Sequence, residues 1–352
     1  MDSKQIVFSF LLVIRNEEKY INDLLLRVLN QDFPEEKYEI IVINGDSTDS
    51  TEQVVRKIMD EHPNRISYYE NPKGILPTGW NIGITNSSGK YIIRVDGHTQ
   101  IPTDFLTKYY DLIQRKPEMA CVGGVIKTKG VGFWGEIIAH VYSHPFGVGN
   151  SLFRITKDKW EGEVDTVPYG AYKREIFKEV GLFNERLNRS EDLDMHARIR
   201  KAGGKFFLSS SIVSTYFSRS TLKAFTKKAL ADGKWTMIAS SGTKGLFRFR
   251  HLVPIIVFMM GIMFTLGSFF SPLILKSFIL LLAIYFTLIG IGSVSMVKKR
   301  KNIAYFFPTF LVFFLLHFIR GYGLLSGLTS KQYWKVKIGY EKRQKATSNN
   351  VL

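Results

Sequence analysis

The sequence predicts an α/β domain, with a mostly parallel sheet flanked by helices, followed by a C-terminal helical membrane anchor. Two observations lead to this fold class. Residues 6–95 alternate between short apolar stretches and longer amphipathic ones, which is typical of a parallel sheet covered on both faces. From His251 onward three apolar runs approach the roughly 20 residues that cross a bilayer. We therefore expect a soluble domain at residues 1–220 and a membrane region at residues 251–328.

The elements of the first domain follow in order from this alternation. Strands are expected where apolar residues run together, at residues 6–14, 38–44, 65–70 and 90–95. Helices are expected between them, at residues 18–31, at residues 50–62 and from the sequence TGWNIG onward. The first apolar stretch is too short to span a bilayer and runs straight into the charged sequence RNEEK, so we expect a buried strand and no cleavable signal peptide.

The C-terminal part is predicted to hold a basic amphipathic segment, three apolar segments and a basic tail. Their expected bounds are residues 221–250, then 251–270, 273–297 and 303–326, and finally 329–352. Ser271 and Pro272 allow a tight hairpin between the first two apolar segments. The third is interrupted near Arg320 and Gly321, so it can cross the membrane or dip in and return. The basic tail favours a return, because positive charge tends to stay on the cytoplasmic side.

The chain has 352 residues and a formal charge of +17, which suggests nucleic acid, an anionic membrane surface or an anionic substrate as a partner. Lysines and arginines crowd the flanks of the apolar segments, and no nucleic-acid-binding module is recognisable, so membrane and substrate are favoured. We expect a multi-pass protein of the cell membrane with its first domain in the cytoplasm. The single cysteine, Cys121, excludes an intrachain disulfide and fits a reducing compartment.

Two short motifs carry possible chemistry. The strand at residues 90–95 ends in Asp96, Gly97 and His98, which offers a carboxylate and an imidazole to a divalent cation at the carboxyl end of a strand. Asp-Gly is also an ordinary turn pair. Glu191 and Asp192 follow Ser190, which is expected to cap a helix up to residue 202, and acids in a first helical turn are stabilised by the helix dipole.

Four motifs in the same order resemble glycosyltransferase family 2 over residues 7–235. They are IRNEE after the first strand, VINGDSTDST after the second, the stretch from NPKGILPTGW to RVDGH, and VPYGAYKREIFKEVGLFNERLNRSEDLD. The third resembles the metal-binding DxD motif in its DxH form, which occurs in a membrane-anchored branch that includes succinoglycan-type exopolysaccharide transferases. The fourth ends in a sequence similar to the catalytic ED pair of the family.

The resemblance implies a GT-A nucleotide-diphospho-sugar transferase fold and a role for each matching residue. Asp96 and His98 would bind Mg²⁺ or Mn²⁺, Asp192 would be the catalytic base, and Glu191 would orient the base or the acceptor. The residues expected to contact the nucleotide-sugar are Arg15, Glu17, Asn44, Asp46, Asp49, Gly79, Asn81 and Asp96. Asn44 departs from the usual Asp, although its carbonyl can still accept a hydrogen bond from uracil. Asp49 can equally cap the next helix, and Gly79 and Asn81 can equally be turn and cap residues.

The function implied is an inverting, metal-dependent transfer of a single sugar from a nucleotide-diphospho-sugar, with a UDP-sugar as the first candidate. The acceptor would be a lipid-linked oligosaccharide in cell-surface polysaccharide biosynthesis, and other polysaccharide-assembly proteins are candidate partners. The sequence ADGKWTM stands where processive members of the family carry QxxRW, which argues against a polymerase. The alternatives are a polyprenyl-phosphate glycosyltransferase and a non-catalytic membrane protein that binds a nucleotide-sugar.

Overall fold

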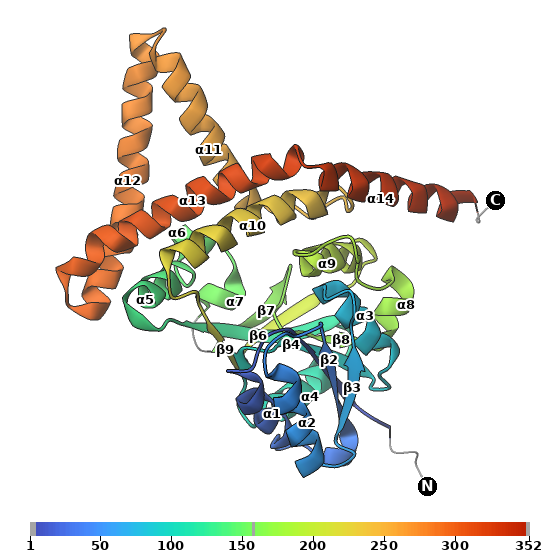
Figure 1. The fold of residues 1–352 in the computed structure, drawn as a ribbon. Coiled ribbons are helices and arrows are strands. Elements are labelled where there is room, and N and C mark those ends of the chain that lie inside the picture. Colours follow the sequence, from blue (N-terminus) through green and yellow to red (C-terminus); the bar gives the residue numbers. More distant parts are fainter. Residues whose placement is uncertain (1–4, 157–158, 350–352) are drawn as a thin grey trace. The chain divides into compact units, whose positions relative to one another are not determined.

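The computed structural model describes residues 5–156 and 159–349, and the chain divides into two compact units (Figure 1). The first unit comprises residues 1–127 and 156–216, and the second comprises residues 128–155 and 217–352. The two units differ from the predicted domains in one segment, because residues 128–155 pack with the C-terminal helices. The last three residues of the predicted basic tail lie outside the described part of the chain.

Nine strands in the described residues form one mixed sheet, in the order β3-β2-β1-β4-β8-β6-β9-β5, with β7 paired to β9. Their bounds are β1 (Phe8–Ile14), β2 (Tyr38–Asn44), β3 (Ile66–Glu70), β4 (Tyr91–Asp96), β5 (Thr99–Gln100), β6 (Cys121–Lys129), β7 (Glu161–Val164), β8 (Ala171–Lys173) and β9 (Phe206–Phe217). The first four strands are parallel to one another, as predicted, whereas β8 pairs antiparallel with both β4 and β6.

The register of the parallel strands brings their carboxyl ends together. β1 lies between β2 and β4, and Ile14 pairs with Asn44 on one side while Val13 pairs with Asp96 on the other. The loops that follow these three strands therefore emerge at one edge of the sheet. In open α/β sheets this edge is where ligands bind.

Helices cover both faces of the sheet in the first unit. Their bounds are α1 (Ile21–Leu29), α2 (Thr51–Glu61), α3 (Leu76–Thr85), α4 (Phe105–Arg115), α8 (Arg174–Val180) and α9 (Glu191–Lys201), with a short 3₁₀ turn at Glu35–Lys37. Phe10 contacts Phe105 of α4, with ring centroids 6.3 Å apart, whereas Val13 abuts Gly79 of α3. Because successive side chains of a strand point to opposite faces, α3 and α4 lie on opposite sides of the sheet. The predicted α/β fold class is confirmed.

The second unit is helical. Its elements are α5 (Gly132–Val141), α6 (Pro145–Val148), α7 (Leu152–Ile155), α10 (Leu222–Ser240), α11 (Phe249–Ser268), α12 (Pro272–Arg300), a 3₁₀ turn at Ile303–Tyr305, α13 (Phe306–Leu328) and α14 (Lys331–Asn349). By length and composition α11, α12 and the segment 303–328 are candidate membrane spans. The hairpin at Ser271 and Pro272 is confirmed. The predicted interruption near Arg320 is wrong, because α13 runs through it without a break.

The core of the second unit joins α5 and α10 to the apolar helices. Phe225 of α10, Val141 of α5 and Phe313 of α13 lie in one fully buried cluster. His317 Nε2 lies 2.6 Å from the carbonyl oxygen of Phe146, so a side chain of α13 is tied to the short helix α6. Residues 128–155 are thus held among the C-terminal helices by both apolar and polar contacts.

Candidate active site

The loops that follow β1 and β2 are tied together by hydrogen bonds. The Asn16 side chain accepts from the backbone N–H of Thr48 at 2.8 Å, and the backbone N–H of Glu17 donates to Thr51 Oγ1 at 2.7 Å. Arg15 donates from Nη1 to a backbone carbonyl of the loop between β3 and α3, at 3.0 Å. These bonds fix three adjacent loops at the edge of the sheet where the predicted site lies.

Three residues predicted to bind the nucleotide lie in the loop after β2. Asn44 is buried, and its Oδ1 accepts from Ser47 Oγ at 2.6 Å and from Ser47 N–H at 3.3 Å. Asp49 Oδ1 accepts from the N–H and the hydroxyl of Thr51, at 3.0 and 2.5 Å, where α2 begins. Asp46 is exposed and has a positive φ of 58°. Asn44 and Asp49 thus stabilise the loop itself, and their contact with a nucleotide stays a prediction.

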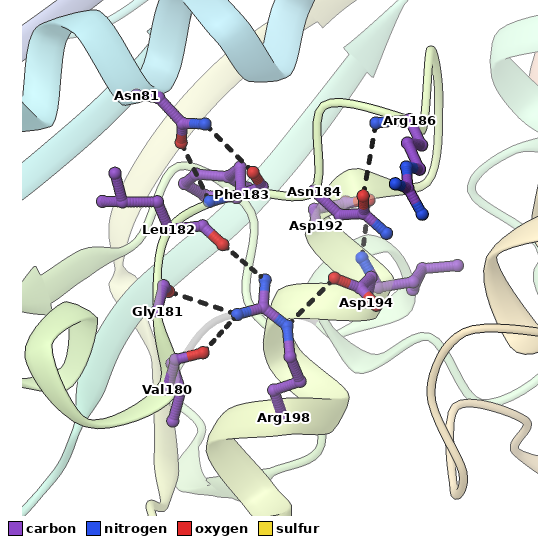
Figure 2. Close-up of polar contacts among 11 residues, drawn as sticks. Asn81, Val180, Gly181, Leu182, Phe183, Asn184, Arg186, Asp192, Asp194 and Arg198 are labelled. Atoms are coloured by element: carbon purple, nitrogen blue, oxygen red, sulfur yellow. Dashed lines mark hydrogen bonds and ion pairs between the residues drawn. The ribbon is translucent and has the colours of Figure 1, made fainter. Parts of the chain in front are cut away.

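Gly79 and Asn81 lie in the middle of α3, so the prediction that they begin this helix is wrong. A Cβ atom on Gly79 would stand 2.5 Å from Val13 Cγ1, so glycine lets the helix approach β1 closely. Asn81 Nδ2 donates to the Phe183 carbonyl at 3.0 Å, and Asn81 Oδ1 accepts from the Phe183 N–H at 2.9 Å (Figure 2). Both residues therefore hold elements of the protein together.

Asp96 ends β4, and His98 follows it in the loop. His98 Nδ1 lies 2.9 Å from Glu17 Oε1, across from the end of the neighbouring strand β1. A Cβ atom on Gly97 would stand 2.7 Å from Glu17 Cγ, so this glycine permits the approach. The carboxylate accepts a hydrogen bond from Nδ1, so in a neutral ring the lone pair is on Nε2. Glu17, predicted to contact the nucleotide, thus contacts the predicted metal ligand.

Tyr169 supports Asp96 from a strained backbone conformation. Its φ is +47°, which is unusual for a residue with a large side chain. The Tyr169 hydroxyl approaches Asp96 Oδ2 at 3.4 Å and accepts a hydrogen bond from Thr99 at 2.9 Å, and its backbone carbonyl accepts from Tyr109 at 2.8 Å. Strain of this kind persists where surrounding contacts hold the residue in place, and it concentrates at functional sites.

Arg94 links the end of β4 to the start of α9. It lies two residues before Asp96 and therefore on the same face of the strand. Its Nη1 is 3.8 Å from Glu191 Oε1, and both side chains are almost completely buried. The guanidinium also lies over the rings of Trp80 and Phe183, 4.9 and 5.0 Å from their centroids. A buried cation thus faces the acid pair of α9, between two aromatic rings.

The charges at this place perturb one another. Burial raises the pKa of Glu191, Asp192 adds to this rise and Arg94 opposes it, so that the pKa is about 7. Burial would lower the pKa of Arg94, but Tyr172, Glu191, Asp192 and Asp96 outweigh it and raise that pKa above its usual value. Arg94 therefore stays charged, and Glu191 can exchange a proton near neutral pH. Asp96, Glu191 and Asp192 thus all interact electrostatically with the same buried guanidinium.

The first turn of α9 carries Asp192 without the predicted cap. Ser190 adopts a left-handed conformation with φ 59°, and its side chain makes no capping hydrogen bond, so that prediction is wrong. Asp192 Oδ1 instead accepts from the backbone N–H of Leu193 at 2.8 Å (Figure 2). An acid that accepts from a first-turn N–H is stabilised by the helix dipole, and this applies to Asp192 here.

A network of Arg198 fixes this helix to the loop before it. Arg198 Nε donates to Asp194 Oδ2 at 3.0 Å, and its other nitrogens donate to the backbone carbonyls of residues 180–182 (Figure 2). Asn81 holds the next residue, Phe183, through both of its backbone groups. The segment that leads to the acid pair is therefore anchored on both α3 and α9.

The donor set at the end of β4 fits a hard or borderline divalent cation. Asp96 supplies a carboxylate, and the His98 ring is oriented by a carboxylate, as in many metal-binding histidines. Within residues 5–156 and 159–349 no group of three His, Cys, Asp or Glu side chains is placed to hold a metal. Asp96 and His98 stay the predicted ligands, and a bound diphosphate or water would complete the coordination of Mg²⁺ or Mn²⁺.

Sequence reasoning missed Arg94 and Tyr169. Arg94 carried a signal, because a charged residue in the apolar strand YIIRVD requires a buried partner or an exposed face. Tyr169 carried none, since its positive φ depends on tertiary contacts. Together with Glu17, these residues orient the side chains that the motifs had identified.

Residues 9–181 match the sequence model of the family described as glycosyl transferase family 2. A dolichyl N-acetyl-alpha-D-glucosaminyl phosphate 3-beta-D-2,3-diacetamido-2,3-dideoxy-beta-D-glucuronosyltransferase of Methanococcus voltae is 32% identical over 328 residues, which cover 91% of this chain and 96% of the relative. The succinoglycan biosynthesis protein ExoA of Rhizobium meliloti is 25% identical over 212 residues, 59% of this chain and 62% of that protein.

Among solved structures, the mannosyltransferase PcManGT of Pyrobaculum calidifontis, in complex with GDP-Man and Mn²⁺, superposes with a TM-score of 0.61. The likeness covers 93% of this chain and 88% of that one, at 15% sequence identity. It therefore bears on the fold alone.

Proposed function

Because this chain belongs to glycosyl transferase family 2 and is a glycosyltransferase, we propose that it transfers a single sugar, with inversion, from a nucleotide-diphospho-sugar to a lipid-linked glycan. The observation that carries the proposal is the buried Arg94, which lies 3.8 Å from Glu191 and whose pKa is raised by Asp96 and Asp192 as well. A candidate donor-binding acid and a candidate base thus share one site at the ligand-binding edge of the sheet.

In the proposed reaction the acceptor hydroxyl oxygen attacks the anomeric carbon. A bond forms between these two atoms as the bond from that carbon to the diphosphate oxygen breaks, and the nucleoside diphosphate leaves. The hydroxyl proton passes to Asp192, which acts as general base. Direct displacement of this kind inverts the anomeric configuration.

Glu191 and Arg94 position this base. Glu191 is next to Asp192 in the first turn of α9, and the pKa of about 7 keeps much of it protonated near neutral pH. A protonated Glu191 beside Asp192 limits repulsion within the pair, and Arg94 stabilises whichever carboxylate is charged. Asp192 then remains available as the acceptor of the hydroxyl proton.

Asp96 and His98 would hold Mg²⁺ or Mn²⁺ next to the diphosphate. When bound, the cation supplies Lewis-acid stabilisation of charge that develops on the leaving diphosphate. Glu17 fixes the tautomer and direction of the His98 ring through the 2.9 Å contact with Nδ1. Tyr169 similarly restrains Asp96 from the other side.

A lipid-linked acceptor is supported by the relative from Methanococcus voltae, whose name gives a dolichyl-linked phosphate sugar as its substrate, and by the apolar helices. An enzyme anchored in a membrane meets a lipid-linked substrate at raised effective concentration. The name of the succinoglycan protein supports a role in cell-surface polysaccharide assembly, with other assembly proteins as candidate partners. We place the catalytic unit on the cytoplasmic side of the cell membrane.

A second candidate function is transfer to a polyprenyl phosphate, which is also supported by the apolar helices. Such an acceptor is already an anion and needs no general base. Full activity of an Asp192→Asn variant on a polyprenyl phosphate would favour this second function. The buried acid pair beside Arg94 favours the first, because a site for an anionic acceptor gains little from two further acids.

Calorimetry on the full-length protein in detergent tests the proposal. UDP-, GDP- and dTDP-sugars are titrated with and without Mn²⁺, and an Asp96→Asn variant serves as control. We expect one nucleotide-sugar to bind in a metal-dependent manner, with a UDP-sugar as the first candidate, and Asp96→Asn to abolish the metal dependence. If no donor binds under any condition, the protein is a non-catalytic member of its family.

A further inference from the structure

The apolar helix α13 has two faces of different character. Its exposed side chains recur at helical spacing along one side, namely Phe307 (77% exposed), Leu311 (41%), Phe318 (43%), Tyr322 (52%) and Leu328 (41%). The opposite face is buried at Val312, Leu316 and Gly323. An apolar stripe is therefore exposed on both sides of the point where α11 crosses it, at Gly321 against Pro254 and Phe258.

The buried face of α13 packs lengthwise on α10. A Cβ atom on Gly323 would stand 2.5 Å from the carbonyl oxygen of Leu230, and one on Gly327 would stand 2.5 Å from that of Lys234. Earlier along both helices, Phe225 of α10 and Val312 of α13 share one buried cluster. Contacts advance together along the two chains, so the helices run side by side and parallel (Figure 1).

The packed partner α10 is too charged to enter hydrocarbon. It carries Lys223, Lys227, Lys228, Asp232 and Lys234 within 19 residues. Charged side chains at the centre of a bilayer are rare and unfavourable, whereas a basic amphipathic helix lies well at the headgroup boundary. If α13 crossed the membrane, it would draw α10 and these charges across with it.

The helices α11 and α12 differ from α13 in this respect. In the most apolar 18-residue stretch of α11 and of α12, 17% and 6% respectively is buried within the protein. The corresponding stretch of residues 303–328 is 28% buried. The turn between them exposes Phe269 and Phe270, and basic residues flank the pair at Arg248 and at residues 298–301. An apolar hairpin with basic residues at both open ends is typical of two spans that return to the cytoplasmic side.

We propose that α11 and α12 cross the bilayer as a hairpin, whereas α13 lies in the plane of the membrane with its apolar stripe in the acyl chains of one leaflet. An aromatic groove of about 500 Å³ between Trp134, Phe286 and Phe314 adjoins this stripe, and leaflet acyl chains fill it. The chain then crosses the membrane twice, and α14 begins on the same side as α10. This inference concerns the anchor and is independent of the proposed reaction.

Cysteine labelling tests the number of crossings. The native Cys121 is buried, so the unmodified protein supplies the background for a membrane-impermeant maleimide. Three single variants at exposed positions, Lys299→Cys, Phe270→Cys and Lys331→Cys, are each labelled in right-side-out and in inverted vesicles. We expect Lys299→Cys and Lys331→Cys to react from one side and Phe270→Cys from the other. Reaction of Lys299→Cys and Lys331→Cys from opposite sides would overturn the in-plane placement, and reaction of all three from one side would overturn the hairpin.

The depth of a nitroxide label provides a second, independent measurement. Labels on Leu311→Cys, Phe318→Cys and Leu328→Cys sample 17 residues of α13, which is about 26 Å of helix. Accessibility to oxygen and to a water-soluble nickel complex should place all three at one shallow depth in lipid vesicles. A label on Leu280→Cys, exposed in α12 on the hairpin side of the contact between Tyr285 and His317, is the matched control and should lie deeper. If Phe318→Cys is as deep as this control while the outer two are shallow, α13 spans the bilayer and the proposal is wrong.

Discussion

Replacing Arg94 by methionine removes a buried positive charge while keeping a side chain of similar length. At the observed 3.8 Å from Glu191, attraction between unit charges is about 4 kcal/mol at an effective dielectric constant of about 20. Removing one partner of a buried ion pair costs about 3–5 kcal/mol. We therefore expect Arg94→Met to lower the free energy of unfolding by about 4 kcal/mol at pH 8.

The loss of stability in Arg94→Met should depend on pH, and the titration of Glu191 determines whether it grows or shrinks as the pH rises. The native pKa of Glu191 is raised to about 7, so the native state keeps a proton that the unfolded chain releases near pH 4.5. Its contribution to the free energy of unfolding therefore falls as the pH rises from about 4.5 through 7. Arg94 opposes this rise in pKa, so without it the pKa of Glu191 increases further. The Arg94→Met variant should be affected much less at pH 5 than at pH 8.

Thermal unfolding in detergent measures these differences for the unmodified protein, Arg94→Met, Glu191→Gln and the double variant. A change of 4 kcal/mol corresponds to a fall in Tm of roughly 10 °C for a domain of this size. The double variant should recover part of that fall, because it leaves no uncompensated carboxylate, and Arg94→Lys should retain most of the stability. Equal losses at both pH values, with additive effects in the double variant, would refute a shared charge between Arg94 and Glu191.

Three further predictions concern residues around the site. Glu17→Ala should weaken the binding of Mn²⁺ in the presence of nucleotide by about 10–100-fold, because the His98 ring loses its orienting partner; electron paramagnetic resonance of free Mn²⁺ measures this, and unchanged affinity would exclude the role. Gly79→Ala should lower stability by about 1–3 kcal/mol through its clash with Val13, and Gly79→Ala/Val13→Ala should recover much of this in thermal unfolding; a lack of recovery would assign the effect elsewhere. Asn81→Ala should lower stability by about 1–3 kcal/mol, because both backbone groups of Phe183 lose their partner; a denaturation midpoint equal to that of the unmodified protein would contradict this.

The sequence allowed the parallel core and its functional edge to be predicted because their signals are local. Apolar strands alternate with amphipathic helices, and Asp96 directly follows such a strand. Parallel strands joined through helices place their carboxyl ends together, so the loops after β1, β2 and β4 could be expected at one edge. The observed register of Ile14 with Asn44 and of Val13 with Asp96 agrees with this expectation.

The contacts between distant segments could not be predicted in this way. Arg94 and Glu191 meet only because α9 packs over the end of β4, and no local pattern reports on that packing. The double hydrogen bond of Asn81 to Phe183 depends equally on tertiary structure, so a turn-like composition suggested the wrong role for this residue. In α13 the glycines suggested a break, but Gly321 serves close packing against α11, Gly323 and Gly327 serve it against α10, and the helix is continuous.

The central claim is that Asp192 takes the proton of the acceptor hydroxyl, and Asp192→Asn tests it most directly. Single-turnover sugar transfer and donor binding are measured on the same purified protein, with Asp60→Asn, an exposed position on α2, as the matched control. We predict that Asp192→Asn slows transfer about 10²–10⁴-fold while donor affinity changes less than about twofold. Transfer at the unmodified rate, or an equal loss of transfer and donor binding, would contradict the account.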